Sequence, residues 1–211
     1  MPSIYHRFAG RSLERIAALS DGVFAIAMTL IVLELKVPPH PDVQSEIALV
    51  EELIRLSPHF ATYAMSFLTL AIFWSGQQAQ LNSLAQSDRK FSMIQIAFLA
   101  AVAILPFSTS LLGEFITFRT ALIIYWLNLA MLGLALFMAW KYAIRAKLVK
   151  EDLPVEMADA VEQRVLRAQT LYLMGAMLCV ASTYLSIAFI FAVQLVYAIA
   201  PRSTFISKLT R

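Results

Sequence analysis

The chain has 211 residues, of which 60% are hydrophobic and only 15% are charged, and its mean hydropathy is +0.71. This composition excludes a soluble domain built around one core. It indicates an integral membrane protein with several helical spans, because about 20 mainly apolar residues are enough to cross the hydrocarbon core. The net charge of +3 is small, so the distribution of charges is more informative than their sum.

The first apolar segment, at about 16–36, combines polar residues with one regular apolar stripe. No small-residue cleavage site follows a short hydrophobic region, so we interpret the segment as an uncleaved first span. Ile26, Leu30 and Leu33 recur at i, i+4 and i+7 and therefore share one helix face, with Thr29 beside them. Such a stripe is either a packing seam or the wall of a pore, where an apolar constriction gates by dewetting.

Asp21 lies near the start of this first span. A charge at the bilayer centre costs about 2.5–3.5 kcal/mol, and less near the interface, so an intramembrane carboxylate usually faces protein or water. Arg15 is six residues away, which is a poor spacing for a pair on one helix face. The carboxylate therefore has two compatible interpretations, a structural network that holds the helix end and a role at a pore mouth.

Five further apolar segments predict an all-α membrane protein with six transmembrane helices in a single domain over residues 1–211. These spans are placed at about 54–79, 91–112, 120–142, 165–182 and 185–200. Residues 168–200 contain neither a charged residue nor proline. This uncharged stretch is too long for one span and just long enough for two short ones. The segment at about 143–164, which can form a short helix after Pro154, is interpreted as a solvated connector.

The basic residues give this arrangement an orientation. With six spans, both termini lie on one side, and only Lys36, Arg55 and Arg119 of the 17 basic residues fall on the other side. The positive-inside rule then places both termini in the cytoplasm. The loop at 37–52, which contains four acidic residues, becomes extracytoplasmic.

The residues that catalysis or metal binding would need are missing or scattered. His6, His40 and His59 lie far apart at or outside the span edges, and Cys179 is the only cysteine. Neither a zinc-protease helix motif nor a serine nucleophile motif is present. We therefore expect no enzyme, no cofactor, no resident metal and no nucleic-acid partner.

Three stretches, in order along the chain, carry a resemblance to a known family. The run from Arg15 to Asp21 is similar to an R-x-x-x-F-S-D signature, with Leu19 in place of phenylalanine. The second stretch runs from Tyr63 to Trp74 and the third is the L-P-F-S-T run at 105–109. Together they resemble the first three helices of the transmembrane protein 175 family of potassium channels, whereas the second half matches only in hydropathy.

This resemblance implies a potassium-permeable cation channel in the cell membrane that lacks a T-V-G-Y-G filter loop, as this chain does. Prokaryotic members carry one six-span unit per chain and form homotetramers in which helix 1 lines a central pore. The implied partners are potassium ions, membrane lipids and further copies of the chain.

The family's pore residues map onto the apolar stripe, which favours the pore over the packing seam. Ile26 takes the place of the narrowest constriction, Leu30 and Leu33 extend it, and Thr29 is implicated in selectivity. At the cytoplasmic end of the first span we expect a polar network of Arg15, Ser20, Asp21 and Gln77. Relatives often have two histidines where this chain has Gln77 and Gln78, and glutamine cannot titrate.

Two alternatives to a channel remain open from the sequence. One is an ion- or proton-coupled secondary transporter that uses Asp21, although such proteins usually show internal repeats and helices broken near the midplane. The other is a structural or lipid-interacting membrane protein without transport. This second alternative gains support if the first span is wholly packed against protein or lipid.

Overall fold

The computed structural model describes residues 13–39 and 43–199, and every named element in these ranges is a helix. The elements are α2 (Leu13–Leu30), η1 (Ile31–Glu34), α3 (Glu46–Arg55), α4 (Ser57–Asn82), α5 (Arg89–Glu114), α6 (Arg119–Arg145), α7 (Val155–Met177), η3 (Leu178–Val180) and α8 (Thr183–Ile199).

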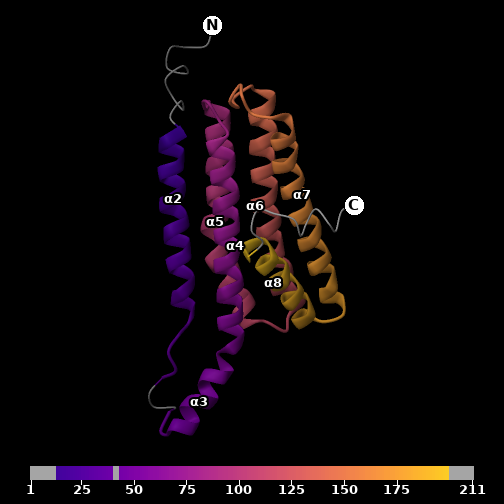
Figure 1. Ribbon diagram of the computed structural model, residues 1–211. Helices are drawn as coiled ribbons and strands as arrows, with labels where there is room; N and C mark the ends of the chain where they lie inside the picture. The colour runs from indigo at the N-terminus through magenta and orange to yellow at the C-terminus, as the bar shows by residue number, and fades with distance from the viewer. Residues whose placement is uncertain (1–12, 40–42, 200–211) are drawn as a thin grey trace.

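Helices α2, α4, α5, α6 and α7 run side by side as a bundle, and α3 projects from the end of the bundle at which α2 finishes (Figure 1). Helix α5 is the central element, because it packs against α2, α4 and α6. Its side chains Phe98, Val102 and Leu105 are completely buried. The shorter α8 closes the bundle by packing against α4 and α7.

Three helical stretches in the described ranges are long and apolar enough to cross a membrane, namely Leu13–Glu34, Arg89–Glu114 and Arg119–Arg145. Helices α3 and α4 form a fourth if the pair, which is bent by 46°, counts as one span. The first half of α7 is charged, and α8 has only 17 residues. The chain is thus a multi-span helical protein, while the number six stays a prediction.

Helix α7 begins at Val155, directly after Pro154, so the predicted connector at 143–164 is helical from Val155 onward. The Lys141–Glu162 ion pair of 2.6 Å and a 3.1 Å hydrogen bond from Trp140 Nε1 to the Ala158 carbonyl fasten this part of α7 to α6. The expected helix after Pro154 is thus present, and it runs without interruption into the predicted fifth span, because a charged helix can continue beyond the apolar layer.

The predicted loop at 37–52 also contains the start of a helix. Ser45 caps α3 by accepting a 3.1 Å hydrogen bond from the Ala48 amide. Glu46 lies in the first turn, where the positive end of the helix dipole favours a carboxylate. The apolar side chains of α3, such as Ile47 and Ile54, remain exposed. Ser45 is a capping residue that the sequence contains, but the acidic composition of the segment favoured a loop.

Gly175 lies where α7 meets α8, and its replacement by alanine tests this contact. An added Cβ would lie 2.7 Å from Cγ1 of the fully buried Ile190 and 3.1 Å from Cδ1 of Phe189. We expect Gly175→Ala to lower the free energy of unfolding by about 1–3 kcal/mol, as overpacking typically does. The measurement is the midpoint of thermal unfolding in detergent. Gly22→Ala is the control, because nothing lies within 4 Å of its added Cβ; equal midpoints for the two variants would contradict the described packing.

Candidate functional site

Helix α2 and its extension η1 have two distinct faces. Four residues at i, i+4, i+7 and i+11 are buried against the bundle: Ser20, Phe24, Ala27 and Ile31. The opposite face carries the apolar stripe, where Ile26 is 60% exposed, Leu30 43% and Leu33 68%. The stripe therefore does not pack within its own chain, which removes the intramolecular packing seam as an explanation.

Aromatic packing holds α2 in this rotation. The ring of Phe24 lies 6.0 Å from that of Phe98 on α5, and Phe98 in turn lies 6.5 Å from Phe73 on α4. All three rings belong to the buried core. Because successive residues are separated by about 100° around a helix, Phe24 cannot keep this position if α2 turns. The direction of the apolar stripe is therefore fixed from within the chain.

Thr29 lies on the exposed face beside the stripe. Its hydroxyl donates a 2.8 Å hydrogen bond to the carbonyl oxygen of Ile26, one turn earlier. The hydroxyl proton is thus engaged, while the oxygen still has acceptor capacity. Gly22, one turn before Ile26, is also exposed and adds no side chain to this face.

A buried hydrogen-bond series joins α2 to α4 and α5 near the start of α2. The Ser20 hydroxyl donates to Oε1 of Gln77, and Nε2 of Gln77 donates to Oε1 of Gln95 at 2.7 Å. All three residues are at most 1% exposed. These three neutral side chains therefore connect three helices through the interior of the bundle.

Asp21 belongs to a separate cluster on the surface of the bundle. Its Oδ1 accepts hydrogen bonds from Trp74 Nε1 at 2.7 Å and from Gln78 Nε2 at 2.8 Å. Asp21 and Trp74 are both exposed. Trp74 is thus a hydrogen-bond partner of the carboxylate.

The expected network of Arg15, Ser20, Asp21 and Gln77 is accordingly divided. Ser20 contacts Gln77 in the interior, and Asp21 contacts other residues outside. Arg15 is exposed, and it lies eleven residues before Ile26, so about three helical turns place it on the face of the stripe. The sequence pattern did not place Gln95 and Trp74 in the network, although their polarity within apolar spans was a usable signal.

The far end of α2 is also attached to the bundle. Oε2 of Glu34, in η1, accepts a 2.6 Å hydrogen bond from the Ser110 hydroxyl of α5. Nothing in the local sequence pairs these two residues, which are 76 positions apart. Among the described residues, no group of three or more His, Cys, Asp or Glu side chains is placed to hold a metal ion.

Comparisons with known proteins support the resemblance seen in the motifs. A family model described as "Endosomal/lysosomal potassium channel TMEM175" matches residues 15–106. A potassium channel of Chamaesiphon minutus is 31% identical over 189 residues, which cover 88% of this chain and 93% of that protein. The chain belongs to the TMEM175 family. This assignment confirms the resemblance, and it confirms the expectation that the chain is not an enzyme, because the family consists of ion channels.

Two further TMEM175 relatives are informative. The crystal structure of a lysosomal potassium-selective channel TMEM175 homolog from Chamaesiphon minutus matches with a TM-score of 0.79 and 29% identity, covering 90% of this chain and 98% of that one. The human protein named endosomal/lysosomal proton channel TMEM175 is 33% identical over 100 residues, 45% of this chain and 20% of its own length. The matched TMEM175 region, residues 15–106, contains all three members of the buried hydrogen-bond series.

Replacing Gln77 with leucine tests the buried hydrogen-bond series. The change leaves the Ser20 hydroxyl and the Gln95 amide oxygen without their partner, and an unsatisfied buried group costs about 1–3 kcal/mol. We expect Gln77→Leu to lower the midpoint of thermal unfolding clearly. Gln78→Leu is the matched control, since it removes one hydrogen bond to an exposed carboxylate that water can hydrate. A larger loss for Gln78→Leu would contradict this description of the site.

Proposed function

We propose that this TMEM175 protein is a potassium-permeable cation channel, a homotetramer whose central pore is lined by α2. The observation that carries the proposal is the apolar face of Ile26, Leu30 and Leu33, which is directed away from its own chain. In a family of ion channels, such a face is suited to a pore shared by several copies. Relatives named potassium channels support potassium as the permeating ion.

Ile26 forms the main constriction in this proposal, and Leu30 and Leu33 extend it along the pore. Apolar side chains that converge on one axis exclude water, and ions cannot pass until the helices separate. Thr29 influences selectivity, because its oxygen can coordinate a partly dehydrated cation while its hydroxyl proton stays hydrogen-bonded to the Ile26 carbonyl. No T-V-G-Y-G filter loop is required.

Arg15, Ser20, Asp21 and Gln77 hold the cytoplasmic end of α2 in this arrangement. The contact of Ser20 with Gln77 supports a positioning role, because it ties the buried face of α2 to α4. The hydrogen bonds that Asp21 accepts from Trp74 and Gln78 support a second attachment to the same helix. Both attachments oppose rotation of α2 and so keep Ile26 directed toward the axis.

The proposal places the protein in the cell membrane with six spans and both termini in the cytoplasm. Helices α7 and α8 supply the fifth and sixth spans, and their contacts with α6 and α4 support this role. The basic residues at the start of α5 and at both ends of α6 support the orientation: Arg89 and Arg145 lie at the proposed cytoplasmic ends, and Arg119 lies at the opposite end of α6.

Planar bilayers containing the purified protein test the function directly. With potassium on one side and sodium on the other, we expect a passive current whose reversal potential favours potassium.

A second experiment with a proton gradient measures the permeability to protons, the ion for which the human relative is named. Absence of current at every voltage, with intact oligomers, would contradict the channel. Proton- or ion-coupled flux in liposomes would then favour the transporter that uses Asp21.

The constriction is tested by Ile26→Asn. A polar side chain at the narrowest point hydrates the neck, so we expect a several-fold larger current and a reversal potential shifted toward zero in the same gradient. Ile123→Asn is the control, because Ile123 is also half-exposed but lies on α6. Its current and selectivity should equal those of the wild type. Unchanged conductance and selectivity in Ile26→Asn would remove Ile26 from the pore.

A further inference from the structure

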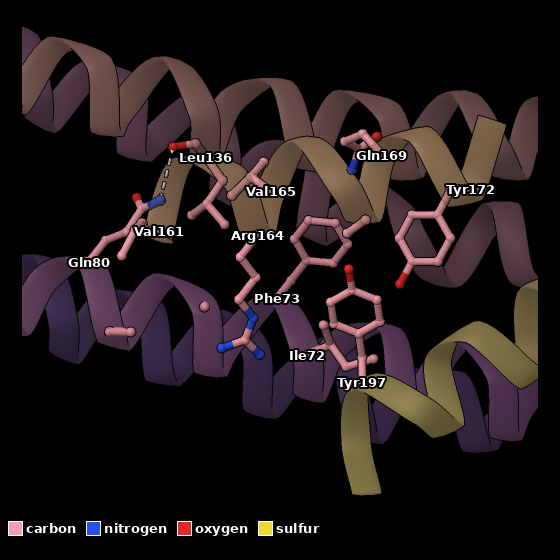
Figure 2. A pocket seen from close by; sticks show the side chains of 13 residues that line it. Ile72, Phe73, Gln80, Leu136, Val161, Arg164, Val165, Gln169, Tyr172 and Tyr197 are labelled. Carbon is pink, nitrogen blue, oxygen red and sulfur yellow. Dashed lines mark hydrogen bonds between the residues drawn. The ribbon is translucent and has the colours of Figure 1, made fainter. Parts of the chain in front are cut away.

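A cavity of about 70 Å³ lies between α4, α6, α7 and α8. Figure 1 shows α7 and α2 at opposite sides of the bundle, so this cavity is distinct from the exposed face of α2. Its walls are mostly apolar, with Phe73 and Tyr172 toward one end and Gln80 toward the other (Figure 2). The cavity is therefore elongated along α4.

One cation borders this apolar space. Arg164 extends from α7 toward α4 (Figure 2) and is exposed. Within the described part of the chain, Arg164 has no hydrogen bond and no ion pair, whereas the nearby Glu162 is already paired with Lys141. The guanidinium is thus available to an anion from outside the protein.

Two buried polar atoms on the cavity wall also have no partner among the described residues. The Tyr172 hydroxyl and Oε1 of Gln80 belong to residues that are 1% exposed, and neither makes a hydrogen bond. The amide nitrogen of Gln80 donates to the Leu136 carbonyl at 3.2 Å, so its oxygen is free to accept. Buried polar groups nearly always have a hydrogen-bond partner. Two such groups that lack one on the wall of a cavity indicate that a bound ligand supplies the missing partners.

The required ligand must combine three properties. It needs an anionic group for Arg164, polar groups for the two wall atoms without a partner, and an apolar chain for the wall that includes Phe73. The polar groups are a hydroxyl that donates to Oε1 of Gln80 and an ester carbonyl that accepts from the Tyr172 hydroxyl. A free phosphate ion satisfies only the first property. An anionic phospholipid satisfies all three, and basic pockets between membrane helices are known to bind such headgroups.

We propose that this cavity is a binding site for an anionic phospholipid, with its phosphate on Arg164 and part of one acyl chain along Phe73 and Tyr172. The Gln80 end lies near the end of α4, two residues before Asn82. In the orientation proposed above, this end faces the cytoplasm, so the lipid enters from the cytoplasmic leaflet. Binding itself does not depend on whether the protein conducts.

Native mass spectrometry of the purified full chain tests the site. Partly delipidated protein is titrated with phosphatidylglycerol or with phosphatidylcholine of the same acyl chains, and bound lipids are counted per chain. We expect one tightly held phosphatidylglycerol per chain, and Arg164→Gln should weaken its binding about tenfold, as loss of one charge-assisted contact does. Phosphatidylcholine should bind weakly and equally to both proteins.

Arg167→Gln is the matched control. Arg167 lies three residues further along α7, donates to Gln163 at 3.0 Å and does not line the cavity. Binding of phosphatidylglycerol to this variant should equal that of the wild type. Equal losses in the two variants would indicate general attraction to basic surface and overturn the site. Complete displacement of the lipid by millimolar inorganic phosphate would overturn the acyl-chain part of the proposal.

Discussion

The rotation of α2 about its own axis is the constraint on which the proposed pore depends. The packing of Phe24 against Phe98 and the contact of Ser20 with Gln77 specify this rotation from the buried side. A turn of one residue, about 100°, would bury Ile26 and expose a packing residue instead. The direction of the exposed face of α2 is therefore determined by residues on its buried face. Substitutions on the buried face can change the proposed pore although these residues contact no ion.

The predictable and unpredictable parts of the structure have different physical origins. Helical periodicity identified the apolar stripe of Ile26, Leu30 and Leu33, because a single helix has one dominant repeat. Motif spacing indicated the family, which the comparisons confirm. Partners such as Gln95 for Gln77 and Ser110 for Glu34 depend on how separate helices dock, so no local pattern reveals them. A helix after Pro154 was expected, but its continuity with the predicted span at 165–182 was not, because the boundary of an apolar layer and the end of a helix are different properties.

The relatives of this chain are named for two different ions, potassium for the bacterial channel and protons for the human one. The polar residues of this chain bear on that difference. Gln77 and Gln78 hold positions from which they reach Ser20 and Asp21, and neither side chain can take up or release a proton near neutral pH. Proton transfer along this layer would need water or the Asp21 carboxylate instead.

The buried hydrogen-bond series has one further consequence, for coupling to the membrane voltage. Moving one elementary charge through a potential of 100 mV supplies about 2.3 kcal/mol, which is how charged helices sense voltage. Ser20, Gln77 and Gln95 carry no net charge, so the transmembrane field does almost no work when these three side chains exchange partners. The interior hydrogen bonds of these three side chains are therefore nearly insensitive to voltage themselves, in contrast to the charged Asp21 on α2, on which a membrane field can act.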